Sequence, residues 1–216
     1  MSQTVLLSVD RNNQEKTSER GPNQKKFTHA TLHFGMLASK DKPGAEIIYG
    51  SSVNLSLGVR KKYKLTSVYS LGFDVEGQFT DFKLKQEKNK LLPDTIINNI
   101  SGRMDYFSLA LGFYNRINFD PYRGNFLGSF LDLGIMGNWY YSIKSISKNK
   151  LTDGTTVKNI VTNLAYVINF DAKVYARIGF GHSSLFGSYR ITDLFKSDSQ
   201  YPDLPRLILG IEFALF

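Results

Sequence analysis

The residues best suited to nucleophilic chemistry are His182 and Ser184, in the run Gly181-His182-Ser183-Ser184. Two positions apart on an extended strand, their side chains point to the same face, where a histidine can activate a serine hydroxyl. Such a site needs a third group to orient the histidine, and the nearest carboxylate in sequence, Asp193, lies past the strand. We therefore favour a structural interpretation, in which the pair sits at the polar end of a strand.

The carboxylates Asp74, Glu76 and Asp132 have the chemistry of general acids and bases. Arginines occur at matching strand positions, which favours structural ion pairs instead. His29 and His33 lie four apart and share a strand face, but no third ligand accompanies them, so we expect no metal site. The chain has no cysteine and no glycine-rich phosphate loop, and we expect no cofactor.

Composition places few limits on the class of protein. The chain has 216 residues with a net charge of +8, enough for one large β domain. Its basic residues are spread over the chain without a single stripe, which argues against nucleic-acid binding. No stretch approaches the roughly 20 apolar residues of a membrane helix, but a membrane β-strand needs only every second residue apolar.

A two-residue alternation of apolar and polar side chains dominates after residue 27. It is clearest at 126–144, where Leu131, Leu133 and Ile135 alternate with Asp132 and Gly134. On that phase Trp139, Tyr141 and Ile143 belong to the apolar face. Strands are predicted at about 27–38, 50–62, 65–84, 101–118, 126–144, 156–170, 173–190 and 205–216.

The predicted connections alternate between short and long. Short turns are expected at 61–64, 120–124 and 170–172, and long polar loops at 39–49, 85–100, 145–155 and 191–204. This is the pattern of an up-and-down barrel with short turns at one end and long loops at the other. The prediction is all-β: an eight-stranded antiparallel up-and-down transmembrane β-barrel.

The polar face is predicted to line the barrel interior. Glycines gather on it, and small residues relieve crowding inside eight strands. Bulky aromatics towards the strand ends are typical of the interfacial girdles of membrane barrels. Charges of both signs also fall on this face and predict a lumenal charge network, because opposite charges in a narrow interior can pair. Its predicted members are Arg60, Asp74, Glu76, Arg116, Asp132, Arg177, Arg206 and Glu212.

The two ends of the chain differ in character. Residues 1–26 are mostly polar and are predicted to be a flexible segment preceding a barrel over 27–216. No signal peptide is visible, so a bacterial outer-membrane location requires a signal removed before this numbering. The last strand ends in the aromatic residue Phe216, out of phase with Phe213. A terminal aromatic is similar to the assembly signal of outer-membrane proteins.

Two further stretches carry a family resemblance: Gly187-Ser188-Tyr189-Arg190-Ile191-Thr192-Asp193-Leu194-Phe195-Lys196 and Leu204-Pro205-Arg206-Leu207-Ile208-Leu209-Gly210. With the strand style of 27–216, they resemble the outer-membrane β-barrel family of Bacteroidota often labelled porin-like or PorT-like. The resemblance implies an eight-stranded barrel, linked in some members to secretion or larger membrane assemblies. It supplies no catalytic motif.

The leading functional hypothesis is a small non-enzymatic outer-membrane barrel, a structural or accessory component with protein partners in a larger membrane assembly. One alternative is an outer-membrane lipid-modifying hydrolase using His182 and Ser184, similar to lipid A deacylases. Another is a lipocalin-like carrier, if the polarity of the two faces is inverted. Loop lysines are expected to contact outer-membrane lipid and lipopolysaccharide phosphates. They are Lys85, Lys88, Lys90, Lys148, Lys150 and Lys196.

Overall fold

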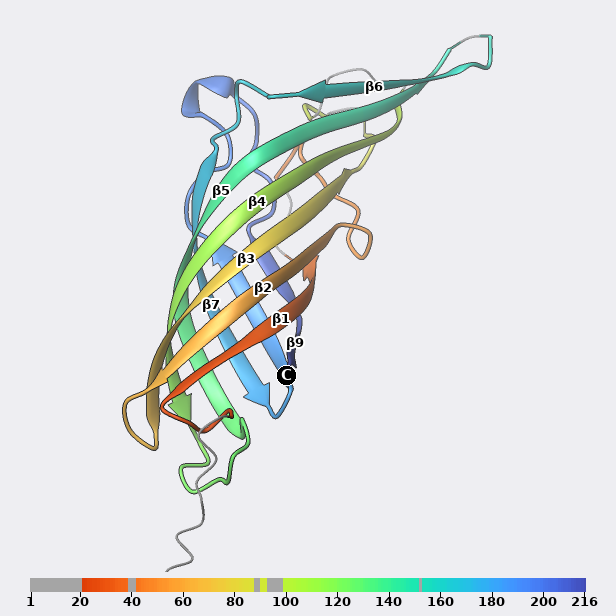
Figure 1. Ribbon diagram of the computed structural model, residues 1–216. Helices are drawn as coiled ribbons and strands as arrows, with labels where there is room; N and C mark the ends of the chain where they lie inside the picture. The colour runs from red at the N-terminus through yellow and green to blue at the C-terminus, as the bar shows by residue number, and fades with distance from the viewer. Residues whose placement is uncertain (1–20, 39–41, 88–89, 93–98, 152) are drawn as a thin grey trace, which may run out of the picture.

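The computed structural model describes residues 21–38, 42–87, 90–92, 99–151 and 153–216, and these form an antiparallel β-barrel (Figure 1). The strands are β1 Lys26–Leu37, β2 Val53–Lys64, β3 Tyr69–Leu84, β4 Asn99–Asn118, β5 Ser129–Lys150, β6 Thr156–Thr162, β7 Phe170–Phe180, β8 Ser183–Arg190 and β9 Leu207–Leu215. A short 3-10 helix covers Ser197–Ser199. No helix in these ranges is long and apolar enough to cross a membrane.

Eight of the strands close into a ring. In the ring, each of β1 to β4 pairs with the next strand in sequence, and β5 pairs with β7. Strand β7 pairs with β8, β8 pairs with β9, and β9 closes the ring by pairing with β1. Short turns at 65–68, 119–128 and 181–182 lie at one end, together with Phe216. The longer connections lie at the other end. The predicted eight-stranded up-and-down barrel is confirmed.

Two of the predicted strands are wrong in detail. The strand expected at 156–170 does not enter the ring, because β6 pairs only with the far half of β5, from Lys144 to Lys150. The strand expected at 173–190 is instead two strands, since the chain reverses at Gly181, whose φ of 62° suits glycine. Residues 170–172, predicted as a turn, belong to β7. The two errors cancel in the strand count.

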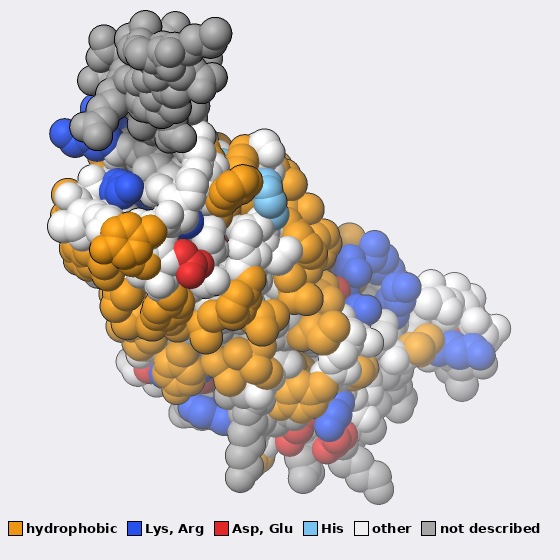
Figure 2. Space-filling model, turned by 90° about the horizontal axis from the view of Figure 1, so that it is seen from below, with side chains coloured by type: hydrophobic (Ala, Val, Ile, Leu, Met, Phe, Trp, Pro, Cys, Tyr) orange, Lys and Arg blue, Asp and Glu red, His pale blue; other side chains and the backbone are white. Residues whose placement is uncertain are grey.

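Along most of each ring strand, side chains alternate between the interior and the outer wall. On β4, for example, Ala110 is fully buried whereas the next residue, Leu111, is 64% exposed. Polar side chains such as Arg60, Asp74 and Asp132 point inward. The outer wall is apolar, and Figure 2 shows hydrophobic side chains covering much of it as seen from the short-turn end. This polarity is that of a membrane barrel and opposite to that of the lipocalin-like alternative.

A β-bulge in β5 changes the predicted phase of its upper half. The pairing with β4 shifts so that Phe107 faces Ser142 while Ser108 faces Tyr140. Tyr141 is the extra residue, and beyond it the alternation is reversed. Ile143, predicted on the outer face with Trp139, is therefore buried inside.

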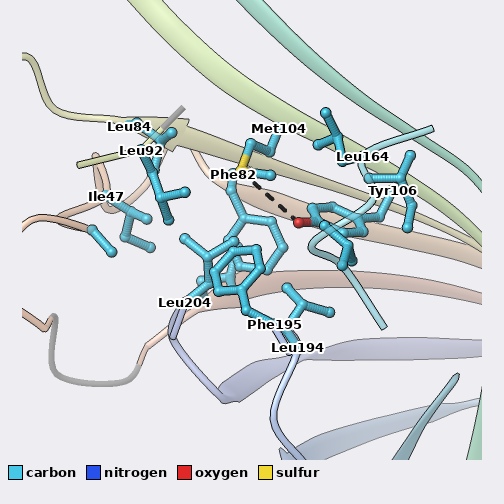
Figure 3. Packing of buried hydrophobic residues seen from close by; sticks show 14 of the residues in the cluster. Ile47, Phe82, Leu84, Leu92, Met104, Tyr106, Leu164, Leu194, Phe195 and Leu204 are labelled. Carbon is cyan, nitrogen blue, oxygen red and sulfur yellow. Dashed lines mark hydrogen bonds between the residues drawn. The ribbon is translucent and has the colours of Figure 1, made fainter. Parts of the chain in front are cut away.

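The long-loop end is closed by an apolar cluster that we call the plug (Figure 3). Loop residues fold over the strand ends and bury their side chains against Tyr106 and Met104 of β4. Half-buried Tyr166 and Tyr201 pack against the cluster, with ring centroids 4.6 Å apart. Loop and strand-end members include Ile47, Phe82, Leu84, Leu92, Leu164, Leu194, Phe195 and Leu204.

Residues 21–25 lie across the short-turn end. Asn23 donates hydrogen bonds from Nδ2 to the carbonyl oxygens of Arg123 (2.9 Å) and Gly124 (3.0 Å). Lys62, buried inside the barrel mouth, donates to the carbonyl oxygen of Pro22. This part of the segment predicted to be flexible is thus tied to the β4–β5 turn. Residues 1–20 lie outside the described residues.

Candidate functional site

The barrel interior holds a charge network at its centre. Arg60 donates from Nε to Oδ1 of Asp74 (2.6 Å) and from its two terminal nitrogens to the carboxylate of Glu212. Arg177 donates from Nη2 to Oδ2 of Asp74 (3.0 Å) and lies 3.4 Å from Glu212. All four side chains are at most 2% exposed, so their charges are stabilised by one another rather than by water.

A second pair extends the network to the next strands. Arg116 on β4 donates two parallel hydrogen bonds to Asp132 on β5, from Nε at 2.6 Å and Nη2 at 2.8 Å. Such bidentate pairs are among the strongest charge-assisted contacts. Arg177 links this pair to the centre through Nε, 3.2 Å from Oδ2 of Asp132. The ring of Tyr114 lies between the three arginines, 4.9–5.7 Å from each guanidinium carbon.

Some members of the network were not identified from sequence. Tyr175 donates to Oδ2 of Asp74 at 2.7 Å. His33 places Nε2 3.2 Å from Glu212 and 3.7 Å from Glu76. The carboxylate of Glu76 accepts hydrogen bonds from neutral Ser56 at 3.1 Å and from Gln78, rather than from an arginine. Each of these residues has the inward phase of its strand, and that phase was the signal available in the sequence.

Arg206 does not belong to the lumenal network, contrary to the prediction. It precedes β9 at the long-loop end, where Nε donates to Oδ2 of Asp203 at 2.8 Å and Nη2 pairs with Asp193. Partial burial acts to lower the pKa of Arg206, but the carboxylates of Asp203 and Asp193 outweigh it and raise this pKa. Asp203 also accepts a hydrogen bond from Arg190 (3.1 Å). Arg206 therefore holds the loop between β8 and β9 in place.

His182 and Ser184 are not on one lipid-facing surface. His182 lies in the β7–β8 turn, exposed and stacked on Phe216 with a centroid distance of 4.4 Å. Ser184 is buried and donates to Oε1 of Glu212 at 3.1 Å. Asp193 lies far along the barrel, paired with Arg206. The pair therefore lacks the shared face and the third group that a nucleophilic site needs.

Both histidines of β1 point inward, and neither lies in a metal-ligand cluster. At the short-turn mouth His29 stacks on Phe27 (centroid distance 4.8 Å) and meets the ring of Phe216 edge-on (5.7 Å). In the part of the chain that the structure describes, no group of three histidine, cysteine or acidic side chains is placed to hold a metal ion.

The outer wall carries a second candidate site, a groove of about 490 Å³ that we call the basic groove. Its lining residues come from the far ends of β3, β4 and β5, from β6 and from the β1–β2 loop. Figure 1 shows these strand ends extending beyond the barrel. The cations of the groove are Lys83, Arg103, Lys148 and Lys158, and its large apolar residues are Ile48, Leu84, Ile100 and Ile146.

Like charges face one another directly across strands in this groove. Lys83 is opposite Arg103 in the β3–β4 pairing, and Lys148 is opposite Lys158 in the β5–β6 pairing. Like charges in such positions destabilise a sheet. Among the carboxylates that the structure describes, only that of Asp105 lies within ion-pair distance of one of these four cations, 3.2 Å from Arg103. The arrangement favours an anion bound between the two pairs.

An aromatic band lies below the basic groove. Phe79, Phe107 and Tyr141 form a row across β3, β4 and β5, with centroid distances of 4.8 and 6.4 Å. Trp139 lies next to this row on β5, 6.4 Å from Tyr141. Lys144, one residue pair above, places Nζ 5.8 Å from the ring of Phe107. On β3 and β4 the change from aromatic to basic side chains takes four residues, with the facing pair Asp81 and Asp105 between them.

The predicted loop lysines have different surroundings. Lys148 lines the basic groove, Lys150 and Lys196 are exposed, and Lys85 is half-buried. Lys90 is buried, and its Nζ donates to Gln86 at 2.7 Å, so it does not face solvent. Lys88 lies outside the described residues. Lys83, Arg103 and Lys158 were not in the predicted set, although all three follow the outward phase of their strands.

No known protein-family profile matches the chain, and no curated protein sequence matches it. Among solved structures it is similar to Ail, the attachment invasion locus protein of Yersinia pestis, at 11% identity and a TM-score of 0.37. A second Ail structure, in complex with the heparin analogue sucrose octasulfate, gives 9% identity and a TM-score of 0.34. Each comparison covers 90% of this chain and 95% of Ail. Similarity at this level assigns no function and gives no support for the PorT-like family.

Proposed function

We propose that this chain is a non-enzymatic bacterial outer-membrane β-barrel, a structural or accessory component that holds a phosphate-bearing glycolipid of the outer leaflet at its long-loop end. The observation that carries the proposal is the basic groove, with its two like-charge pairs, on the long-loop side of the aromatic band. Aromatic bands of membrane barrels lie at the level of the lipid headgroups. The groove would therefore lie at the height of the phosphates of lipopolysaccharide.

The chemistry of the groove suits such a lipid. Lysine and arginine attract phosphate, each contributing about 1 kcal/mol near an anionic membrane surface. Ile48 and Ile100, which are 44% and 55% exposed, offer an apolar contact for the acyl part of the same molecule. A soluble polyanion would use the cations but leave the isoleucines in water. We therefore favour the lipid.

A filled interior supports a structural role over transport. The central charge network occupies the lower part of the barrel, and the plug occupies the long-loop end. Eight strands leave little room beyond side chains in any case. On this basis the chain would act through its outer wall and its projecting strands. We also propose that the chain consists of a polar segment over 1–26 and a barrel over 27–216. Membership of the PorT-like family is proposed as well.

The test is lipid binding by a groove variant in which Lys83, Arg103, Lys148 and Lys158 are all replaced by Gln. Purified protein in detergent would be titrated with fluorescent lipopolysaccharide and, separately, with its enzymatically dephosphorylated form. We expect the variant to bind the phosphorylated form on the order of a thousandfold more weakly, because four cations at about 1 kcal/mol each contribute about 4 kcal/mol. Wild-type protein should prefer that form, and its affinity should fall as salt is raised.

A matched control variant carries Gln at Lys25, Lys26, Lys61 and Lys64, four lysines at the short-turn end. It loses the same charge and should bind like the wild type. Equal weakening in both variants would mean that net charge alone matters and would exclude the groove as a site. Wild-type binding of a sulfated polysaccharide as tight as that of the lipid would point to a soluble polyanion instead.

A further inference from the structure

Among the described strands, β6 is the one that lies outside the ring, and one of its edges is unpaired. It pairs with β5 on one side only, and in Figure 1 it is the outermost strand at that end of the molecule. All seven of its residues are exposed, including Ile160 at 52% and Val161 at 55%. An open edge with exposed β-branched side chains is a template for pairing with another strand.

The sequence of β6 suits pairing with itself. Thr156-Val157-Lys158-Asn159-Ile160-Val161-Thr162 reads almost the same in both directions, with only Lys158 and Ile160 exchanged. An antiparallel pair of identical strands centred on Asn159 would set Val157 opposite Val161 of the second copy, and Thr156 opposite its Thr162. Pairs of β-branched residues and pairs of threonines are favourable cross-strand neighbours.

The same register also keeps Lys158 from facing a second lysine. Lys158 would lie opposite Ile160 of the second copy rather than opposite another lysine, so no like charges would meet across the new edge. By contrast, Lys158 does face Lys148 within its own chain. A twofold axis through Asn159 would give an isologous contact, and since each chain offers one such edge, pairing would stop at two copies.

We infer that β6 is a self-pairing edge through which two copies of this chain form a dimer with a sheet continuous across both. The inference does not rest on lipid binding by the basic groove. It also explains why an exposed hairpin arm carries apolar residues on both faces, where a solvated edge would be expected to carry several charges. A contact of seven residues is small, so dimerisation should depend on protein concentration.

Cysteine cross-linking tests the register, because the chain has no cysteine of its own. Asn159→Cys places two thiols opposite each other on the axis, with Cα atoms about 4.5–5.5 Å apart, within the range of a disulfide. Lys158→Cys is the matched control. Its thiols would be diagonal neighbours about 7–8 Å apart, beyond ready closure. Under mild oxidation of outer-membrane preparations, most Asn159→Cys protein should run as a dimer on reducing-agent-free gels, and Lys158→Cys protein as a monomer. Equal cross-linking of the two variants, or none, would overturn the inference.

A charge design gives a second, independent measurement. The double variant V157K/V161K sets lysine opposite lysine twice and should be monomeric by light scattering in detergent at concentrations where the wild type dimerises. The variant V157K/V161E sets lysine opposite glutamate twice and should regain the dimer. A wild type that is monomeric at every concentration, or a V157K/V161K variant that dimerises like the wild type, would count against the self-pairing edge.

Discussion

Asp132 accepts two hydrogen bonds from Arg116, at 2.6 and 2.8 Å, and its side chain is completely buried. The two residues face each other directly across β4 and β5. Neither charge has access to bulk water, so each depends on the other for stability. Asp132 also contacts Arg177, but removing Asp132 leaves Arg116 as an uncompensated buried charge.

Asp132→Ala should lower the free energy of unfolding by about 3–5 kcal/mol for this reason. Urea unfolding of the barrel in lipid vesicles, followed by tryptophan fluorescence of Trp139, measures it. Asp198→Ala is the matched control, because Asp198 is an exposed loop residue whose loss should change stability by less than about 0.5 kcal/mol. A similar effect in both variants would show that Asp132 does not face a closed interior.

Two glycines of β5 predict opposite outcomes for one substitution. A Cβ at Gly134 would lie 2.5 Å from Cζ of Tyr175 and 2.6 Å from the carbonyl oxygen of Phe113, so the interior must shift to accept it. A Cβ at Gly137, on the outer wall, meets nothing within 4 Å. Gly134→Ala should cost about 1–3 kcal/mol, as overpacking does, and Gly137→Ala should be neutral or stabilising. Equal unfolding midpoints for the two variants would contradict the tight packing around Tyr175.

The purified monomer should conduct no ions. The charge network and the plug occupy two levels of the interior, and the cavity between them has a volume of only about 30 Å³. Planar-bilayer recording should therefore show no stable, stepwise conductance. Loop residues supply part of the plug, so the variant F195A/L204A tests whether the loops contribute to closure. Stepwise currents from the wild-type monomer would restore a pore function.

The structure also predicts the outcome for the alternative hydrolase. Ser184→Ala removes the 3.1 Å hydrogen bond to Glu212 and should cost about 1 kcal/mol of stability. His182→Ala removes a ring stacked on Phe216 and should have a similarly small effect. Neither change should alter lipid A acylation in cells, as measured by mass spectrometry of extracted lipid. A loss of deacylated lipid A in both variants would revive the enzymatic hypothesis.

The alternation of side chains in the sequence was enough to establish the barrel and its polarity. Arg60, Asp74 and Asp132 share one phase and Leu55, Val75 and Leu133 the other, and the glycines and charges of both signs on the polar phase indicated that this phase faces the narrow interior. The strand count and the short and long connections followed from the same signal. Most of the lumenal charge network did too, since its members share the inward phase.

The pairing partners of each strand could be decided only by the tertiary structure. Strand β6 was predicted as part of a ring strand, and it lies outside the ring because it pairs only with the end of β5 beyond the part that pairs with β7. The bulge at Tyr141 reversed the faces of Ile143 and Ser142, and the turn at Gly181 separated His182 from Ser184. The basic groove exists because Lys83 meets Arg103, and Lys148 meets Lys158, across strands distant in sequence. The two-residue period of a strand tells which face a residue is on. The register between paired strands decides which residues are neighbours on that face.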